Sequence, residues 1–399
     1  MRVYIFGIDG YLGWSLAQYL AGHGHIVSGI DNCARRKQWV PEMGSDSVTP
    51  IAPPEKRLKA FKKHFGDEHF SDHLYTYVRD ARNLDTVKQC LLKFQPDCIV
   101  NLAHMPSAPY AMIDFEHCQE TQMNNLTTTN AVIWAVKELM PHVPIVTIGS
   151  AGEYGTPNTD IAEGYFDMEY NGRQARVLFP RMTPASFYHA SKVASSVNIE
   201  RACSWWGLTA TDIMQSVVYG TRHKHSVDDD AMVGRIDVDQ CFGTVANRFV
   251  AQAILGHPLT VYGAGTQKRG LLPLRDSMEC LRLLIETPPD RGEYRVVNQY
   301  DQIHSMNEVA GMVARVGGEE FGLNVIIDHL ENPRCEEEDH HYEIERKVLV
   351  SLGYEPKGVL VQELRLIFDD MLRHRDRISL FRDAILPTVT WKSGKGKQK

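Results

Sequence analysis

The sequence predicts an α/β fold in which a doubly wound parallel sheet is followed by a smaller C-terminal lobe. In the first half of the 399 residues, short β-rich runs alternate with longer segments of helical periodicity. This alternation is typical of a parallel sheet that is covered by helices on both faces. The first run also opens directly into Gly7, Gly10 and Gly13, a spacing that favours a tight strand-to-helix turn.

The order of the elements follows from the spacing of the apolar residues. We expect strands at residues 2–6, 26–31, 74–78, 98–101 and 144–149, and helices at residues 12–21, 85–93, 119–139 and 187–206. Four prolines among polar residues predict an irregular insertion at residues 40–70. A second insertion, residues 154–184, contains Asn171-Gly172, which suits a tight hairpin turn. After residue 215 the pattern loosens, and strands are expected at residues 259–262 and near residues 293–298.

The glycine-rich turn predicts a dinucleotide site. The glycines let backbone N–H groups at a helix N-terminus approach a pyrophosphate, and Asp31 follows about twenty residues later, where a carboxylate can accept bonds from ribose hydroxyls. A carboxylate there repels a 2′-phosphate, so NAD is favoured over NADP, although Arg35 and Arg36 nearby weaken that preference. The other candidate contacts to the cofactor follow the strands or line its groove: Tyr11, Leu12, Asn32, Asp80, Ala81, Leu102, Ala103 and Val218. For Asp80, capping of a helix is an equal alternative.

Ser150, Tyr188 and Lys192 are the candidate catalytic residues. Ser150 ends an expected strand, where α/β sheets bind ligands, and Tyr188 and Lys192 lie one helical turn apart. A phenol can remove a proton from a sugar or alcohol hydroxyl only if a nearby cation lowers its pKa, and we expect Lys192 to be that cation. Ser150 can share the same substrate proton while a hydride leaves to NAD. For His189, contact with the substrate and simple packing are both open.

These motifs divide the chain into two units and a tail. Residues 1–214 form an NAD-binding Rossmann domain with insertions at 40–70 and 154–184. Residues 215–385 form mainly a substrate-binding lobe, partly interleaved with the first domain. Residues 386–399 form a C-terminal tail, and we expect its basic tract from Trp391 onward to be solvated.

The charge and composition exclude several classes of partner. A net charge of -7 and a pI of about 6.2 argue against nucleic acid, because phosphate contacts need a basic face. Long apolar stretches and a signal-like N-terminus are absent from the sequence, so we expect a soluble, cytoplasmic protein that has no contact with a membrane. The eight cysteines lack the spacing of a metal site, and we expect reduced thiols and no metal.

The chain resembles the extended short-chain dehydrogenase/reductase family, which includes nucleotide-sugar epimerases and dehydratases. More narrowly, it is similar to the UDP-sulfoquinovose synthase group. The motifs that carry this resemblance lie at residues 7–14, 31–32, 107–114, 152–158, 187–192, 217–220, 256–263, 332–334 and 387–391. It therefore covers nearly the whole chain.

The resemblance implies further roles. Ser150, Tyr188 and Lys192 would be catalytic, with Ser150 in place of the usual Thr, and Asn125 would help to order the lysine. The residues implied to face the substrate are Gln215 at the sugar, Arg269 and Arg334 at the pyrophosphate, and Thr260, Val261 and Tyr262 at the base. Forked arginine donors suit a pyrophosphate. UDP would be the usual carrier, with ADP and GDP as alternatives, and helices 119–139 and 187–206 would pair in a homodimer.

Departures from the group decide which reaction we expect. Where the sulfoquinovose synthase group has Gly-Glu-Gln-Arg, the chain has Ala103-His104-Met105-Pro106, so an expected arginine is missing. The chain also has Ala151-Gly152 where the 4,6-dehydratases have an Asp-Glu pair, and Glu153 comes one residue later. We therefore expect a nucleotide-sugar 4-epimerase that acts through a transient 4-keto sugar. The alternatives are a UDP-sulfoquinovose synthase, which uses UDP-glucose and sulfite, and a dehydratase or decarboxylase. His104 and His189 could serve as additional proton carriers at the substrate. A non-catalytic NAD-binding sensor is an alternative of a different class.

Overall fold

The computed structural model describes residues 1–70, 79–181, 184–334, 341 and 343–391. Its main sheet has six parallel strands among these residues, in the order β11-β7-β4-β3-β1-β2. Their bounds are β1 Arg2–Phe6, β2 Ile26–Ile30, β3 Cys98–Asn101, β4 Ile145–Ile148, β7 Ala210–Gln215 and β11 Tyr294–Gln299. The doubly wound parallel sheet is therefore confirmed, while the strand expected at residues 74–78 lies outside the described residues.

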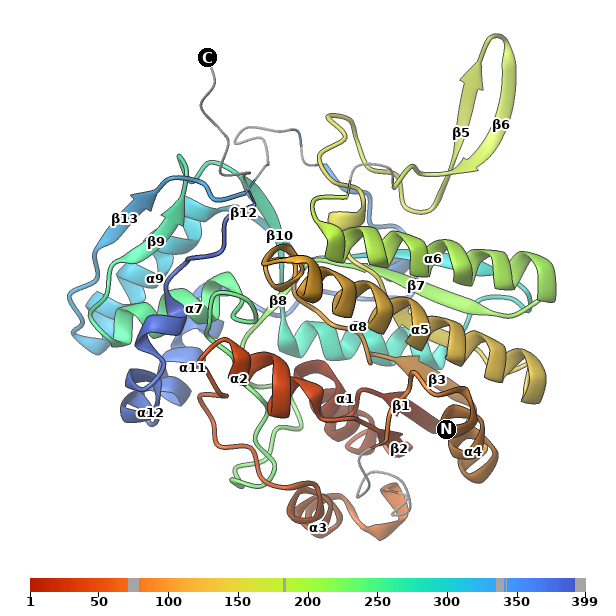
Figure 1. Cartoon of the computed structure of the whole chain (residues 1–399), viewed down its shortest axis with the longest axis horizontal. Helices are drawn as coiled ribbons and strands as arrows, with labels where there is room; N and C mark the ends of the chain where they lie inside the picture. Colours follow the sequence, from red (N-terminus) through yellow and green to blue (C-terminus); the bar gives the residue numbers. More distant parts are fainter. Residues whose placement is uncertain (71–78, 182–183, 335–340, 342, 392–399) are drawn as a thin grey trace.

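Helices cover both faces of this sheet (Figure 1). The helices on one face are α1 Tyr11–Ala21 and α8 Leu274–Glu286, and those on the other are α4 Leu84–Phe94, α5 Phe115–Leu139 and α6 Phe187–Trp206. Strand β7 was not expected from the sequence, and β11 comes from the 215–385 range. The chain thus returns to the first sheet after it has begun the second lobe.

The smaller lobe packs three helices around its own apolar core. Its helices are α7 Val245–Ile254, α9 Met306–Phe321 and α11 Leu360–Leu372, and its strands are β8 Val217–Tyr219, β9 Leu259–Tyr262, β10 Lys268–Pro273, β12 Gln302–Ser305 and β13 Ile327–Leu330. Two short helices, α10 Val348–Ser351 and α12 Arg375–Ser379, and a 3₁₀ turn at Arg382–Ile385 complete the C-terminal part. Strands β8 and β10 come from the part of the chain after residue 215, where the sequence pattern loosens. They lie at the carboxyl edge of the main sheet.

The two insertions differ from each other. Residues 40–70 are not irregular, since they contain α2 Val40–Glu42 and α3 Pro54–Phe65. Pro54 occupies the first turn of α3, where a missing N–H is tolerated, and α3 buries Leu58 and Phe61 on one face. In the second insertion, β5 Tyr165–Tyr170 and β6 Arg173–Leu178 form a hairpin that projects from the body (Figure 1). Asn171 and Gly172 both have positive φ, as the expected tight turn requires.

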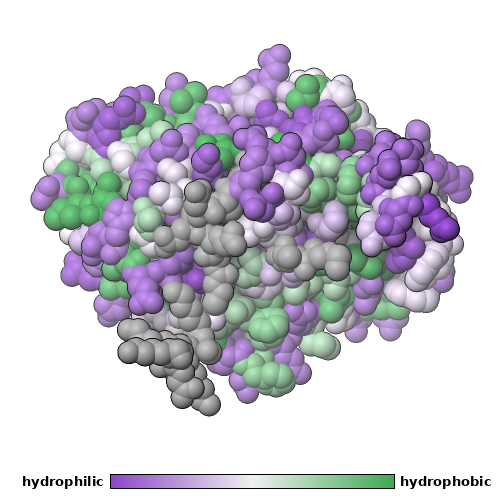
Figure 2. Space-filling model, turned by 90° about the horizontal axis from the view of Figure 1, so that it is seen from above, coloured by the Kyte–Doolittle hydropathy of each residue, from purple (hydrophilic) through white to green (hydrophobic). Residues whose placement is uncertain are grey.

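The surface mixes residues of both kinds. Seen from above, hydrophobic residues show in small groups among hydrophilic ones (Figure 2). Exposed large apolar side chains occur repeatedly on α5 and α6, at Phe115, Met123, Trp134, Phe187, Val197 and Trp205. No helix among the described residues is long and apolar enough to cross a membrane.

Candidate active site

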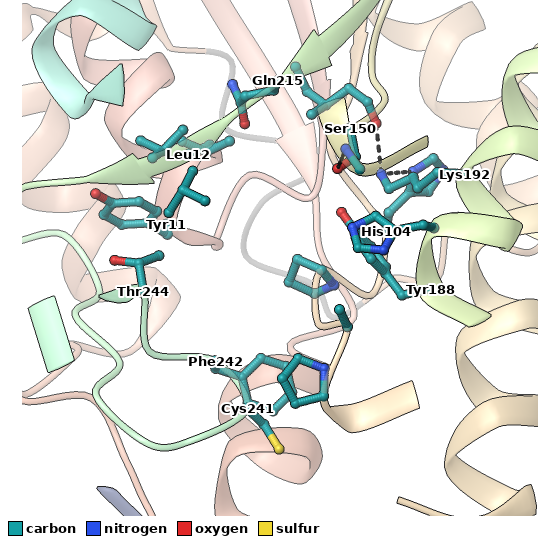
Figure 3. A pocket seen from close by; sticks show the side chains of 18 of the residues that line it. Tyr11, Leu12, His104, Ser150, Tyr188, Lys192, Gln215, Cys241, Phe242 and Thr244 are labelled. Carbon is teal, nitrogen blue, oxygen red and sulfur yellow. Dashed lines mark hydrogen bonds between the residues drawn. The ribbon is translucent and has the colours of Figure 1, made fainter. Parts of the chain in front are cut away.

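A cavity of about 890 Å³ lies where the carboxyl ends of the main-sheet strands meet the smaller lobe. The turn between β1 and α1, the ends of β2, β3 and β4, and helix α6 supply one wall, while β8, α7, β9 and β10 supply the other. Figure 3 shows Tyr11 and Leu12 on one side of this space and Ser150, Tyr188, Lys192 and His104 on the other. Ligands of open α/β sheets bind at this edge.

The β1–α1 turn forms a cradle that only glycine permits. Gly7 has a φ of +84°, and a Cβ there would lie 2.7 Å from the Leu102 carbonyl carbon. A Cβ at Gly13 would lie 2.1 Å from the Gly7 carbonyl oxygen. Helix α1 begins at Tyr11 behind Gly10, which has no capping side chain, so the first N–H groups of the helix are available to an anion. The cradle fits the pyrophosphate of a dinucleotide.

Asp31 stands at the end of β2 and lines the cavity. Its two oxygens accept the backbone N–H groups of Cys33 at 2.7 Å and Asp9 at 3.0 Å. Burial raises the pKa of Asp31 to about 6, and the charge of Asp9 adds to the rise while the two N–H bonds oppose it. These bonds fix the carboxyl where the sequence predicts ribose hydroxyls.

Arg35 and Arg36 are engaged elsewhere. Arg35 donates to the Asp237 carboxylate at 2.8 Å, and Arg36 donates to Asp9 at 2.7 Å. Arg35 still lines the cavity, but Arg36 is not among the described residues that do so. The assignment of Arg36 to the cofactor stays a prediction, and the guanidinium of Arg36 is paired with the buried Asp9 carboxylate.

Helix α6 and the end of β4 bring Ser150, Tyr188 and Lys192 together at one end of the cavity (Figure 3). Lys192 is buried, and its Nζ lies 5.7 Å from the centre of the Tyr188 ring. Burial lowers the pKa of Lys192 to about 8, while the charges of Glu153 and Asp212 oppose that fall. Ser150 begins a short 3₁₀ turn, Ala151–Glu153, and its hydroxyl accepts the Gly152 N–H.

The expected lowering of the Tyr188 pKa is not seen in the protein alone. Burial raises the pKa of Tyr188, the charge of Glu153 raises it further, and only the hydrogen bond to Ser150 lowers it. Glu153 is fully buried; one of its oxygens accepts the Ser150 N–H at 2.8 Å and the other lies 3.5 Å from Arg181. Glu153 therefore lies behind the catalytic residues and does not take the place of a dehydratase acid.

His104 holds the catalytic lysine. Lys192 donates to His104 Nδ1 at 2.7 Å and to the Ile148 carbonyl at 2.7 Å. His104 Nε2 in turn contacts Thr129 Oγ1 at 3.0 Å. Burial and the charge of Lys192 lower the pKa of His104, so the ring is neutral and can accept from the ammonium. His104 lines the cavity, but its ring nitrogens face Lys192 and Thr129 rather than a substrate.

Asn125 does not contact Lys192. Its carbonyl accepts the Met105 N–H at 2.7 Å, and its amide donates to Ser191 Oγ at 2.8 Å and to the Met105 carbonyl. Asn125 is fully buried, and it does not appear among the described residues that line the cavity. The role implied for Asn125 stays a prediction: Asn125 is bonded to Met105, the residue after His104, and His104 is bonded to Lys192.

His189 also lines the cavity, next to Tyr188. A Cβ on Gly152 would lie 2.2 Å from His189 Nε2, so the ring lies directly against the residues that follow Ser150. Ser186 contacts Nδ1 at 3.0 Å and thereby orients the ring. Burial lowers the pKa of His189 to about 3, and the charges of Arg334, Arg269 and Lys192 lower it further. His189 is therefore a neutral imidazole among cations.

Arginines and an aromatic ring line the part of the cavity that the smaller lobe and Arg334 supply, which we call the arginine end: Arg248, Tyr262, Arg269 and Arg334. Arg248 is buried and donates to the Tyr262 hydroxyl at 3.2 Å. Tyr262 also lies 5.6 Å from the Arg334 guanidinium. Such a group of forked cations suits a diphosphate.

The structure brings most of the candidate residues to this one cavity. Besides those described above, the lining includes Asn32, Asp80, Ala81, Ala103, Gln215, Val218, Thr260 and Val261. Sequence reasoning missed the loop at residues 240–244, Arg248 and Trp391, which also line it. Residues 392–399 of the basic tract that was expected to be solvated lie outside the described residues, while the backbone N–H of the half-buried Trp391 donates to the Pro333 carbonyl at 2.8 Å. The only signal in the sequence for a role of these positions was the presence of aromatic and basic side chains among them.

Fold and site together are those of a dinucleotide-binding enzyme with Ser150, Tyr188 and Lys192 as its candidate catalytic set. Residues 3–298 match the model of the NAD dependent epimerase/dehydratase family. The chain belongs to this family, and its cofactor is NAD, as predicted. It is an enzyme that modifies nucleotide sugars.

Two curated relatives extend over nearly the whole chain. A UDP-sulfoquinovose synthase from Sulfolobus acidocaldarius is 44% identical over 98% of both chains. The chloroplastic UDP-sulfoquinovose synthase of Spinacia oleracea is 38% identical over 98% of this chain and 79% of its own length. The predicted resemblance to this group is therefore confirmed, and the relatives favour the alternative reaction over 4-epimerisation.

Solved structures show the same fold. The UDP-glucose 4-epimerase of Thermotoga maritima, solved with UDP-glucose, matches with a TM-score of 0.65 and 15% identity, over 97% of this chain and 100% of its own. The UDP-glucuronic acid 4-epimerase of Bacillus cereus, solved with UDP-glucuronic acid and NAD, matches with a TM-score of 0.65 and 18% identity, over 94% and 99%. At these identities the likeness establishes the fold alone.

Proposed function

We propose that the enzyme replaces the C6 hydroxyl of UDP-glucose with sulfite, giving a UDP-linked 6-sulfonate and water. The observation that favours this reaction over 4-epimerisation is the position of His189. Epimerisation at C4 needs one acid–base group beside the hydride acceptor, whereas loss of the C6 hydroxyl needs a second one at C5. His189 supplies a second group on the same cavity wall as Ser150. The near-full-length relatives name sulfoquinovose as the product of that group.

The first step is oxidation at C4 of the sugar. When bound, NAD accepts the hydride from C4 and later returns it. Tyr188 takes the proton of the C4 hydroxyl, and Ser150 donates to and accepts from the same oxygen. Lys192 provides the positive charge that favours the Tyr188 phenolate. The neutral His104 ring accepts a hydrogen bond from the Lys192 ammonium and does not neutralise its charge. The resulting C4 ketone makes the C5–H bond acidic.

His189 then removes the C5 proton. Its Nδ1 is engaged by Ser186, so Nε2 is the atom left to act as base. The C6 hydroxyl leaves as water with the proton that His189 has taken, and a double bond forms between C5 and C6. The sulfur lone pair of hydrogensulfite adds to C6, its proton passes through His189 to C5, and the ketone is reduced again. The net change exchanges one hydroxyl for one sulfonate and has no net oxidation.

Arg269 and Arg334 link binding of the substrate diphosphate to the basicity of His189. Both arginines lower the pKa of His189 in the protein alone. A bound diphosphate pairs with them and neutralises their charge, so it raises the pKa of His189 and makes the ring a stronger base. Lys192 is the third cation that acts on His189 and can attract sulfite, whereas position 106 is occupied by Pro106 and supplies no arginine for this role.

The product identifies the reaction. We expect purified enzyme to convert UDP-glucose into a UDP-linked 6-sulfonate only when sulfite is present, as followed by NMR and mass spectrometry. His189→Asn should abolish the sulfonate while reduction of bound NAD by UDP-glucose continues. Formation of UDP-galactose without sulfite would instead establish 4-epimerisation. Absence of any reduction of NAD by nucleotide sugars would overturn the whole assignment.

We also propose that the enzyme is a homodimer through α5 and α6. These helices pack side by side and expose several apolar residues, including Phe115 at 72% and Trp205 at 69% exposure. Exposed apolar groups of this kind mark interaction surfaces. A second copy of the same helix pair would cover them.

A further inference from the structure

The C-terminal segment at residues 386–391 lies against the arginine end of the cavity. The Gln240 side chain donates to Thr388 Oγ1 at 2.7 Å and accepts the N–H groups of Thr388 at 2.6 Å and Val389 at 2.9 Å. Its backbone N–H donates to the Ala384 carbonyl at 2.9 Å. Because Gln240 itself lines the cavity, these bonds fasten the segment to the cavity wall.

Trp391 ends this segment beside Arg334. The Arg334 guanidinium lies 5.1 Å from the Trp391 ring and 5.6 Å from the Tyr262 ring. Both distances are within the range of cation–π attraction. The Trp391 N–H also donates to the carbonyl of Pro333, the residue before Arg334. One tryptophan therefore contacts both the backbone and the side chain of this part of the cavity wall.

We infer that Trp391 is a positioning residue that holds Arg334 for the diphosphate of the substrate, an inference that rests on the proposed function only in taking the ligand to be a nucleoside diphosphate. An unrestrained arginine loses side-chain freedom when it binds, whereas one held by aromatic rings has lost it already. The C-terminal segment is thus part of the substrate site.

The test is the affinity of the NAD-loaded, full-length enzyme for UDP, measured by isothermal titration calorimetry. Trp391→Ala should weaken UDP binding about tenfold, which is about 1.4 kcal/mol. Trp391→Leu keeps apolar bulk without an aromatic face and should lose about as much, while Trp391→Phe should stay within about threefold of the wild type. A chain that ends at Trp391 and lacks residues 392–399 is the matched control and should bind as the wild type does.

A double-mutant cycle separates positioning from a general structural effect. If Trp391 acts through Arg334, Trp391→Ala should change UDP affinity less than about twofold in an Arg334→Gln background. The same tenfold loss in both backgrounds would overturn the inference, and so would unchanged binding in Trp391→Ala. Because UDP lacks the glucosyl group that reacts, a failure to make a sulfonate would leave this result unaffected. The two proposals can therefore fail separately.

Discussion

At the scale of single residues, the site depends on what surrounds the catalytic lysine. Lys192 makes two hydrogen bonds to neutral acceptors, and one of them, His104, lies 88 positions earlier in the chain. A neutral acceptor fixes the ammonium without forming an ion pair. The charged groups that act on Lys192 from behind are Glu153 and Asp212, while Tyr188 and His189 lie on the cavity side.

A pH profile tests the role of His104. Because the pKa of Lys192 is lowered to about 8, the cation is present below that pH and lost above it, and reduction of NAD by UDP-glucose should fall as pH rises through about 8. His104→Glu places a carboxylate beside the ammonium, which favours the charged form, so the fall should move upward by about one pH unit. His104→Gln is the neutral control and should keep the wild-type profile. An unchanged profile in His104→Glu would show that His104 does not act through Lys192.

The same contacts show what a sequence can and cannot reveal about a site. Gly7, Gly13, Tyr188 and Lys192 belong to motifs that span a few residues, so their spacing alone indicated a common cavity. The contact of His104 with Lys192, the pairing of Arg36 with Asp9 and the place of Trp391 all join distant positions. Nothing in local spacing encodes such contacts, because they depend on how whole elements pack.

At the scale of elements, α3 shows how an insertion supports the cofactor turn. Arg57 on α3 is fully buried, donates to Asp9 Oδ1 at 2.8 Å, and lies 4.3 Å from the Trp14 ring of α1. Asp9 belongs to the glycine turn itself. The prolines of residues 40–70 concealed this helix, because Pro54 is compatible with its first turn while it interrupts other positions.

Removing this anchor should destabilise the domain. Arg57→Ala leaves the buried Asp9 carboxylate with one fewer partner and a cavity beside Trp14, so we expect a loss of about 3 kcal/mol in the free energy of unfolding. Lys59→Ala, on the exposed side of the same helix, should change it by less than about 0.5 kcal/mol. Denaturant unfolding measures both. Equal effects of the two variants would mean that the pairing with Asp9 contributes nothing to stability.

At the scale of the whole molecule, two distant parts of the chain form one cavity wall each. The fold of the first half could be predicted from its regular alternation of strands and helices, and helix α6 has the bounds that were expected for it. Strand β7 was missed because a fully buried strand shows no alternation of polar and apolar residues. The smaller lobe was described only loosely, because β8, β10 and β12 pair across long stretches of sequence.

The proposed dimer predicts an assembly of two copies of a 45.2 kDa chain. Val197→Glu would place a carboxylate on the exposed face of α6. Burying this charge in the interface would remove its hydrating water, so sedimentation should shift toward the monomer. Leu380→Glu, at an even more exposed apolar residue away from α5 and α6, should leave the dimer intact. A wild-type monomer at micromolar concentration would contradict the dimer.

The fate of the hydrogen at C5 tests the central claim most directly. UDP-glucose labelled with deuterium at C5 should lose that label to solvent during turnover with sulfite, because His189 removes the C5 proton. The recovered sulfonate should carry hydrogen at C5, as measured by NMR. Full retention of deuterium at C5, with inversion at C4, would contradict elimination and would establish a 4-epimerase.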